Sequence, residues 1–354
     1  MKGIILHAGH GTRLRPLTHT GPKQLLPIAN KPMSQYCIES LRDAGIIDIA
    51  IVIGGVGFNK VKEYYQNGDK FGVNISYIEQ DSPKGIAHAI SLCKDFVSDE
   101  KFVVFLGDNI MSRPINDLVQ KFSKNDIDAL LLLCEVDNPK QFGVAEIDGK
   151  KIKQIIEKPK IPSSNLAVTG IYFLTSEIFN FIKLLKPSWR NELEIADALQ
   201  LLLDKNKKVD FEIITDFWKD TGTPNDIILA NSKVLENIFK KYSNKIHDSK
   251  HHESIFIGKS TTIDKNSKII EPVLIGQNCI IDNNAIIGPN VTIGDNCHIS
   301  GCNINNSIIM SNCQIKTKIN LANSIIAYNC KILLKNESDS HDQFLLGEGT
   351  DITL

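Results

Sequence analysis

The first part of the chain with a capacity for chemistry is a loop rich in glycine, arginine and lysine. It runs from His7 to Ile28 and reads HAGHGTRLRPLTHTGPKQLLPI. Gly9 and Gly11 let backbone N–H groups approach an anion closely, because no Cβ intervenes. Arg13 supplies a planar guanidinium that matches phosphate oxygens, and Lys23 adds a mobile point charge. The loop fits neither a Walker motif nor a dinucleotide fingerprint. Two cations favour a triphosphate ligand, and the alternative is a basic surface turn.

Two aspartates could hold a divalent cation beside such phosphates. Asp108 follows the buried apolar run 102–106 in FLGDNI, and Asp220 precedes a glycine turn in FWKDTGT. A carboxylate at the carboxyl end of a central strand is well placed to bind Mg²⁺. The sequence therefore predicts a shared magnesium site if the two aspartates come together. The alternative for Asp108 is that it simply forms a turn with Asn109.

A second pocket is predicted around residues 140–175, where a hairpin is centred on Asp148-Gly149. It carries Glu157 and Lys158 in IIEKPK, so that the lysine could meet a second anion and the glutamate could bond hydroxyls. No Ser-His-Asp or Cys-His pattern supplies a nucleophile. This favours direct displacement on a nucleotide phosphate by a phosphate monoester, which is already ionised near pH 7 because its second pKa is ~6. The protein would then contribute alignment and charge neutralisation.

Short apolar runs alternate with amphipathic stretches through residues 1–240, which predicts a mostly parallel sheet with helices on both faces. Ligands bind beyond the carboxyl ends of the strands in such sheets, and the glycine-rich loop follows the first strand directly. Strands are predicted at Lys2–Ala8, Asp48–Gly54, Asn74–Glu79, Phe102–Leu106 and Ala129–Val136. Helices are predicted at Met33–Ala44, Asn59–Gln66, Gly85–Phe96, Ile115–Ser123, Glu192–Lys205 and Pro224–Lys240.

The pattern changes after residue 240. Residues 241–253 are polar and unpatterned, which is typical of a linker, and the His251-His252 pair there is expected to be solvated. From Ile257 to Ile299, isoleucine recurs every six residues, with a small or β-branched residue four positions later. This is the hexapeptide repeat of a β-helix, and we expect it to fill residues 254–354 as one unit that the bond-forming step does not need. An insertion is expected near residues 301–306, with the period resuming at Ile309. Small core positions then fall on Cys279, Cys297 and Cys313.

The bulk composition excludes several classes of partner. The 354 residues carry 40 Lys+Arg against 41 Asp+Glu, so nothing global favours a nucleic acid or a membrane surface. No apolar run approaches the ~18–20 residues of a membrane span. The eight cysteines include no C-x-x-C pair, which argues against a zinc site or a disulfide framework. We therefore expect a cytoplasmic protein with reduced cysteines and no nucleic-acid or membrane partner.

Together these segments resemble the sugar-1-phosphate nucleotidylyltransferases, and most closely the long form of glucose-1-phosphate thymidylyltransferase, which has a left-handed β-helix tail. The resemblance implies an α/β fold, in which a Rossmann-like nucleotidyltransferase domain with a mixed, mostly parallel sheet precedes a left-handed parallel β-helix. The matching segments are GTRLRPLT (11–18), PKQLLPI (22–28), NKPM (30–33), EQDSPKGIAHA (79–89), LGDN (106–109), FGV (142–144), EKP (157–159), AVTGIYF (167–173), NELEIAD (191–197) and WKDTGT (218–223).

The resemblance also implies a role for each matching residue. Arg13, Lys23, Asp108 and Asp220 would be catalytic, and the two aspartates would hold Mg²⁺. The nucleotide would contact Leu6, Ala8, Gly9, Gly11, Thr12, Arg13, Gln80, Gly85 and Asp108. The sugar phosphate would contact Asn109, Gly143, Glu157, Lys158, Val168 and Tyr172, with Glu192 nearby. Two departures from the family pattern are Ala8, where a glycine is usual, and NELEIAD in place of RGELEITD.

The implied activity converts dTTP and glucose 1-phosphate to dTDP-glucose and pyrophosphate, in a protein expected to be a homo-oligomer. Three alternatives stay open. The enzyme could prefer UTP, or it could be bifunctional, with an acetyltransferase on the β-helix for which His298 and His341 are candidates. The third alternative is a non-catalytic regulatory relative, which would typically have lost Arg13, Lys23 or an aspartate, whereas all are present here.

Overall fold

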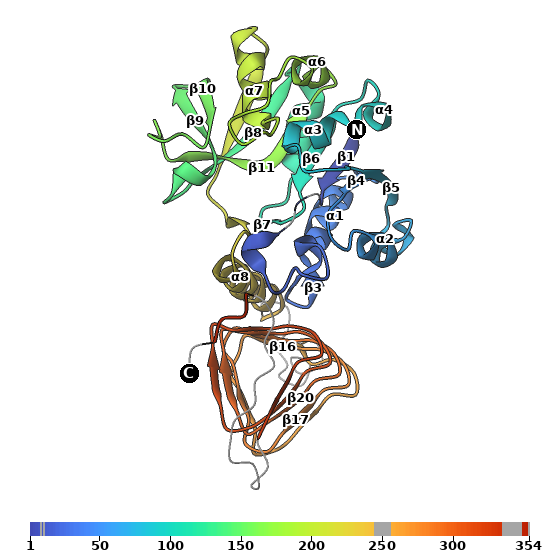
Figure 1. The fold of residues 1–354 in the computed structure, drawn as a ribbon, viewed down its shortest axis with the longest axis vertical. Coiled ribbons are helices and arrows are strands. Elements are labelled where there is room, and N and C mark those ends of the chain that lie inside the picture. The colour runs from blue at the N-terminus through green and yellow to red at the C-terminus, as the bar shows by residue number, and fades with distance from the viewer. Residues whose placement is uncertain (8, 10, 244–255, 335–348, 353–354) are drawn as a thin grey trace. The chain divides into compact units, whose positions relative to one another are not determined.

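The computed structural model describes residues 1–7, 9, 11–243, 256–334 and 349–352 (Figure 1). The chain folds into two compact units. The first unit consists of Met1–Gly11, Thr20–Leu25 and Met33–Asp220. The second consists of Thr12–His19, Leu26–Pro32 and Thr221–Leu354. The predicted boundaries at residues 240 and 254 stay predictions, because residues 244–255, which include most of the predicted linker, lie outside the described residues.

The first unit is built on a mixed sheet that has nine strands within the described residues. Four strands run parallel and end with β5 at one edge, and the rest add mostly antiparallel pairs, as expected for a mixed sheet. The parallel strands are β1 (Lys2–Leu6), β4 (Asp48–Ile53), β5 (Asn74–Glu79) and β6 (Phe102–Leu106). The other strands are β8 (Ala129–Glu135), β9 (Gly143–Asp148), β10 (Lys151–Glu157), β11 (Leu166–Leu174) and β12 (Val209–Ile214).

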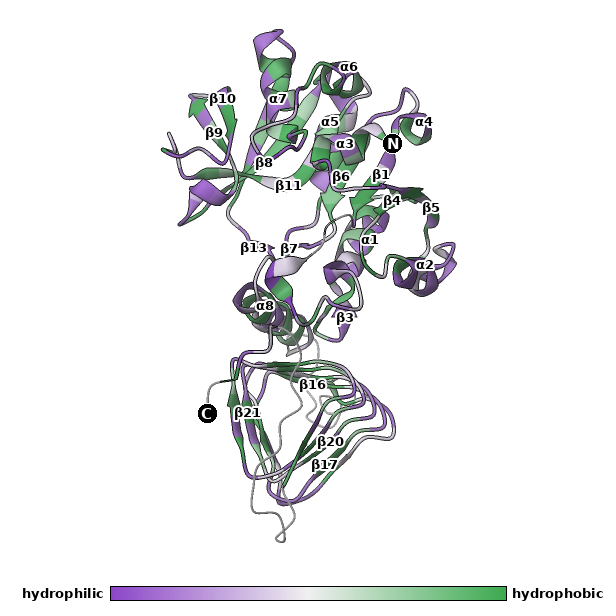
Figure 2. Ribbon diagram, viewed as in Figure 1, coloured by the Kyte–Doolittle hydropathy of each residue, from purple (hydrophilic) through white to green (hydrophobic). Residues whose placement is uncertain are grey.

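Helices cover both faces of this sheet, because alternate residues of each central strand are apolar and point to opposite sides. One face buries Ile4 with α3 (Ile86–Ser91), α6 (Ile178–Ile182) and α7 (Ile195–Asp204). The other buries Ile5 against α1 (Met33–Asp43), α2 (Asn59–Tyr65) and α5 (Asn116–Lys124). Strands β4, β6 and β11 are accordingly hydrophobic over most of their length (Figure 2).

One predicted helix is wrong in its extent. The stretch from Gly85 to Phe96 is not continuous, because α3 ends at Ser91 and α4 (Lys94–Val97) begins after a break. At the break, the Cys93 N–H bonds the Ile90 carbonyl, three residues back rather than four, at 2.9 Å. This tighter turn leaves the Cys93 side chain fully buried in the core.

The second unit contains the predicted left-handed parallel β-helix. Among the described residues, its short strands form three parallel sheets of five, four and four strands, the sides of a triangular coil (Figure 1). Residues at equivalent positions stack from coil to coil, as in the column Ile281, Ile299, Ile315 and Ile332. The stacked isoleucines fill a continuous interior, so each coil buries its apolar side against the next.

The expected insertion near residues 301–306 is wrong. Ile287 stacks on Ile304, which lies only five residues after Ile299, so the coil is shortened there and not lengthened. The corner formed by Asn283 and Asn284, both with positive φ, is matched in the next coil by Gly301. A second corner residue is lost between Ile304 and Ile309, because Ile309 stacks on Ile293 only five residues after Ile304. The six-residue period therefore shifts twice in this coil while the stacking continues.

The cysteines of the β-helix are packing residues, as predicted. Cys279, Cys297 and Cys313 stack in one column, and each thiol donates to a backbone carbonyl in the following coil at 3.0–3.2 Å. Cys302, which the sequence pattern did not single out, is also buried in this interior. Among the described residues, all cysteines are free thiols.

Helix α8 (Pro224–Ser243) belongs to the second unit and begins with a reciprocal cap. The Thr223 N–H donates to Asp226 Oδ2 at 2.9 Å, and the Asp226 N–H donates to Thr223 Oγ1 at 3.3 Å. With Pro224 at the first helical position, this is a capping box that fixes where the helix starts. None of the helices in the described part of the chain is both long enough and apolar enough to cross a membrane.

Candidate active site

A short antiparallel pair brings the two predicted metal-binding aspartates together. β7 (Asn109–Met111) pairs with β13 (Trp218–Asp220), so that Asn109 lies opposite Asp220. Asp108 is the residue immediately before β7, and its backbone is therefore next to that of Asp220. The indole N–H of Trp218 donates to Asn109 Oδ1 at 2.7 Å, and Asn109 Nδ2 donates to Asp108 Oδ1 at 3.1 Å. These bonds fix the orientation of the Asp108 carboxylate.

Lys23 forms an ion pair with the buried carboxylate of Asp108. The lysine begins a 3-10 turn, Lys23–Leu25, that follows Pro22. Burial by itself would raise the pKa of Asp108, but the positive charge and hydrogen bond of Lys23 outweigh it and leave the pKa below its ordinary value. The carboxylate therefore stays ionised at neutral pH, as a metal ligand must.

The donor set suits Mg²⁺. Protein sites usually bind this ion through one or two carboxylates and leave its other positions to water and substrate phosphates. Asp220 at the end of β13 and Asp108 just before β7 supply two carboxylates. No group of three or more His, Cys, Asp or Glu side chains that could hold a metal occurs among the residues that the structure describes. Two carboxylates leave most coordination positions of such an ion to other ligands.

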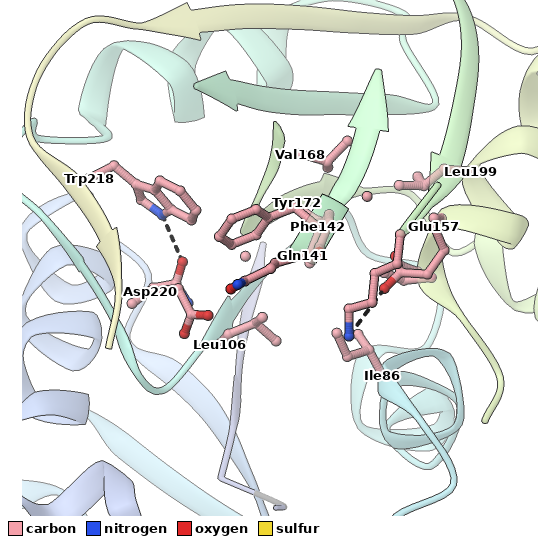
Figure 3. Close-up of a pocket in the computed structure, with 16 residues that line it drawn as sticks. Ile86, Leu106, Gln141, Phe142, Glu157, Val168, Tyr172, Leu199, Trp218 and Asp220 are labelled. Atoms are coloured by element: carbon pink, nitrogen blue, oxygen red, sulfur yellow. Dashed lines mark hydrogen bonds and ion pairs between the residues drawn. The ribbon is translucent and has the colours of Figure 1, made fainter. Parts of the chain in front are cut away.

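A pocket extends from Asp220 to the hairpin β9–β10 (Figure 3). Trp218 and Asp220 lie at one side of the view and Glu157 at the other, with Tyr172 and Phe142 between them. The Phe142 and Trp218 rings meet edge to face, with centroids 5.7 Å apart. The lining comprises Ile86, Leu106, Asn109, Gln141, Phe142, Gly143, Glu157, Lys158, Val168, Gly170, Tyr172, Ile195, Ala196, Leu199, Trp218 and Asp220.

Glu157 ends β10 opposite Gly143, the first residue of β9. A Cβ at Gly143 would lie 3.2 Å from Glu157 Oε2, so the glycine leaves room for the carboxylate. Burial raises the pKa of Glu157; the nearby Lys158 opposes this shift, whereas the Glu194 carboxylate adds to it. The Lys158 ammonium is 3.8 Å from Glu157 Oε1. The pocket thus ends in the desolvated carboxyl of Glu157 beside the Lys158 ammonium. The carboxyl can bond hydroxyls, and the ammonium can bind an anion.

The predicted nucleotide-binding residues of the first unit lie at the carboxyl ends of its parallel strands. Leu6 is the last residue of β1, and Gln80 follows β5. The Gln80 side chain is buried, and its Nε2 is 2.8 Å from Nδ1 of His88 on α3. Gly85 precedes α3 with φ 99°, and a Cβ there would lie 2.4 Å from the Leu193 carbonyl oxygen. Only glycine fits that position without a backbone shift.

Comparison with known proteins identifies the family. The nucleotidyl transferase family model matches residues 2–237. The chain belongs to the nucleotidyl transferase family. A second model, the GMPPB C-terminal domain, matches residues 269–352.

Three relatives of this nucleotidyl transferase carry names that bear on its substrates. The low-salt glycan biosynthesis nucleotidyltransferase Agl11 of Haloferax volcanii is 46% identical over 70% of the chain and 70% of its own length. The glucose-1-phosphate thymidylyltransferase of Streptomyces griseus is 42% identical over 67% of the chain and 66% of its own length. The UTP–glucose-1-phosphate uridylyltransferase AglF of Haloferax volcanii is 37% identical over 67% of the chain and 97% of its own length.

Other predicted residues of the nucleotidyl transferase lie elsewhere or cannot be placed. Thr12 and Arg13 belong to the second unit, where a Cβ at Gly222 would lie 3.0 Å from an Arg13 Nη. In the first unit, Gly9 and Gly11 have positive φ, 153° and 58°, as a glycine-dependent bend requires. Ala8, His10 and His341 lie outside the described residues.

Two further candidates lie beside charged side chains. Glu192 does not line the pocket and pairs with Arg190 at 3.1 Å. His298, the acetyltransferase candidate, lies on the β-helix with its Nε2 3.9 Å from Asp282 Oδ2.

Sequence reasoning missed Arg190 and much of the pocket wall. The Arg190 guanidinium makes two bonds to Glu194, at 2.7 and 3.1 Å, and lies 3.6 Å from Glu157. It therefore offsets part of the negative charge behind the pocket. The sequence did contain a hint of this arrangement, because Arg190 in WRNELE lies close to Glu192 and Glu194, which would otherwise lack a positive partner. The apolar wall from α7, Ile195 and Leu199, was hidden because apolar helix residues ordinarily face the core.

Proposed function

We propose that this nucleotidyl transferase transfers the thymidylyl group of dTTP to glucose 1-phosphate, giving dTDP-glucose and pyrophosphate. The observation that carries the proposal is a single pocket with Asp220 and Asn109, the neighbour of Asp108, at one end and Glu157 and Lys158 at the other. Such a pocket suits a ligand whose phosphate lies between the aspartates and Lys158 and whose hydroxyls lie near Glu157. The sequence match to the nucleotidyl transferase family, and the relatives named for glucose 1-phosphate, support the same substrates.

The reaction needs no protein nucleophile. An oxygen of the ionised sugar phosphate bonds to the α-phosphorus of the nucleotide, and the bond from that phosphorus to the bridging β-phosphate oxygen breaks. Lys23 and Arg13 would bind phosphate oxygens and offset the charge that develops on them. Asp108 and Asp220 would hold Mg²⁺, which supplies further neutralisation. Glu157 would accept hydrogen bonds from sugar hydroxyls, and Lys158 would pair with the sugar's phosphate.

The choice between dTTP and UTP rests on one methyl group. Burying a methyl contributes roughly 0.8 kcal/mol, and apolar pockets discriminate by about 10–200-fold. Gln80 offers an amide that can bond the groups common to thymine and uracil, so it cannot separate the two bases. The relatives include enzymes named for each activity. We favour dTTP, with UTP as a weaker substrate and purine nucleotides almost inactive.

The test is a matrix of kcat/KM values for dTTP, UTP, GTP and ATP, each with glucose 1-phosphate, galactose 1-phosphate and N-acetylglucosamine 1-phosphate at saturating Mg²⁺. The highest value is expected for dTTP with glucose 1-phosphate. A preference for UTP would support the same nucleotidyl transfer but with uracil, and not thymine, as the preferred base. Inactivity with every pair, in a folded protein, would favour the non-catalytic alternative. The same preparations give the oligomeric state, for which the homo-oligomer stays a prediction.

A further inference from the structure

A tight turn of the second unit has an unusual backbone conformation. It joins β2 (Pro27–Ile28) to β3 (Lys31–Pro32), and its two residues, Ala29 and Asn30, have φ values of 48° and 59°. Two-residue hairpins of this kind require positive φ at both central positions. Alanine takes that conformation at a cost, so neighbouring groups must hold the turn in place.

A buried asparagine on α8 holds this turn. Asn231 is 1% exposed, and its Oδ1 accepts the Ala29 N–H at 2.9 Å. The same oxygen accepts the hydroxyl of Thr292 at 2.8 Å, and Thr292 is a fully buried residue in the β-helix strand β19 (Val291–Ile293). One carboxamide oxygen therefore connects three elements of the second unit: the hairpin, α8 and the β-helix.

The β-helix also bonds the turn directly. Asn30 Nδ2 donates to the Ile293 carbonyl oxygen at 2.7 Å, one residue from Thr292. The hairpin is thus tied to β19 by one direct bond and by one bond shared through α8. Because Thr292 and Ala29 are buried, water cannot replace the shared bond when one partner is lost.

The hairpin is continuous with the segment that carries Lys23. Ala29 lies six residues after Lys23 in the sequence, and the chain between them includes the buried residues Gln24, Leu26 and Ile28. The near end of this segment is held by the ion pair of Lys23 and by the bond from Ser34 Oγ to the Gln24 carbonyl oxygen at 3.1 Å. Because this segment is short and mostly buried, we expect a shift at Ala29 to move the backbone of Lys23.

We propose that Thr292, Asn231 and Asn30 are positioning residues, through which the β-helix sets the placement of Lys23 for catalysis. The proposal rests on the proposed function, since Lys23 is assigned to the nucleotide phosphates there. It changes what we expect of the tail. From the sequence alone, the β-helix was expected to be dispensable for bond formation, whereas these bonds make it part of the support for a catalytic loop.

The experiment uses the full chain and substitutions that remove only the bonds to the β-helix. Thr292→Val deletes the hydroxyl at nearly constant volume, and Thr292→Ser is the conservative variant that keeps it. Asn30→Gly removes the direct bond while tolerating the positive φ. The matched control is Asn296→Gly, because Asn296 also has positive φ, 57°, and donates its side-chain amide to Asn312 at 3.1 Å within the β-helix.

Two measurements are made on each variant. The first is kcat and KM with dTTP and glucose 1-phosphate, and the second is amide hydrogen exchange of residues 23–33 without substrates. We expect the double variant Asn30→Gly/Thr292→Val to lower kcat about five- to tenfold, as loss of roughly one buried hydrogen bond's stabilisation would give. The KM for glucose 1-phosphate should change less than twofold. Exchange in residues 23–33 should rise in this variant and stay unchanged in Thr292→Ser and Asn296→Gly.

The outcomes separate this proposal from the proposed function. If wild-type protein is active and the double variant keeps kcat within twofold of Asn296→Gly, the β-helix does not position Lys23 and the proposal is overturned. If the double variant does not fold, the single variants decide in the same way, with an expected two- to threefold loss each. If wild type shows no transferase activity, the proposed function fails, and the exchange measurement still tests whether the β-helix holds residues 23–33.

Discussion

His7 predicts a specific acid sensitivity of the first unit. Its side chain is 1% exposed, and neither ring nitrogen has a hydrogen-bond partner among the described residues. Burial lowers its pKa from 6.5 to about 3, while the Asp108 charge acts weakly in the opposite direction. Below pH 6.5, His7 is therefore mostly protonated in the unfolded chain, whereas in the folded chain it stays neutral until the pH approaches 3. Stability is lost progressively as pH falls from 6.5 toward 3, and between pH 7 and pH 5 this histidine alone accounts for about 2 kcal/mol.

The perturbation that isolates this effect is His7→Leu, which fills a similar volume and does not titrate. We expect the variant to lose about 2 kcal/mol less than wild type between pH 7 and pH 5. Both tryptophans, Trp189 and Trp218, belong to the first unit, so denaturant unfolding followed by their fluorescence reports on that unit. His19→Leu, at a more exposed histidine of the second unit, is the control. Identical pH dependence in wild type and His7→Leu would refute the reasoning and show that His7 finds a partner when charged.

Three further predictions concern the active site. Asp220→Asn should lower kcat several hundred-fold with Mg²⁺, because metal-borne charge stabilisation contributes several kcal/mol, and its circular dichroism should be unchanged; near-normal turnover would exclude a shared metal. Glu157 has a raised pKa, so its carboxylate forms at higher pH than usual, and the KM for glucose 1-phosphate should fall as pH rises through that pKa. Glu157→Gln should remove this dependence, and a persistent slope would assign it elsewhere. Gly85→Ala should lower the free energy of unfolding by about 1–3 kcal/mol and raise the KM for dTTP. Gly149→Ala is the control, because nothing lies close to that glycine, and its effect should be smaller. Equal losses of stability in urea unfolding would contradict the close contact at Gly85.

The regular parts of the fold were predictable because their patterns are long or repeated. Strands β5 and β6 match their predicted ranges. β6 is a buried apolar run, whereas β5 mostly alternates exposed polar residues with partly buried apolar ones. The six-residue period gave the β-helix for the same reason. Prediction failed where small local changes, of one or two residues, alter the geometry. The shortened corner at Gly301 breaks the period without breaking the stacking, and Cys93 tightens one helical turn.

The site was predictable in its residue types but not in its construction. Asp108 and Asp220 could be chosen because acidic residues beside glycine turns at strand ends suit a metal. What brings them together is the pairing of β7 with β13, two three-residue strands that are too short to show any periodicity. The pocket wall was also hard to predict, because a loop without periodicity positions part of it. Glu157 was identified from EKP, but the neighbouring Arg190 depends on a loop that places its guanidinium beside Glu194.

The ion pair between Lys23 and Asp108 determines how activity measurements at Lys23 must be interpreted. A buried carboxylate is costly unless a cation compensates it, and Lys23 provides that cation without any ligand present. Removing the lysine would therefore take away the proposed phosphate contact and also allow burial to raise the pKa of Asp108. The second effect weakens with rising pH, because a sufficiently high pH ionises the carboxyl again, whereas the lost phosphate contact is not restored. Comparing Lys23→Met with wild type at pH 7 and pH 9 separates the two contributions, since only the part that recovers at pH 9 belongs to Asp108.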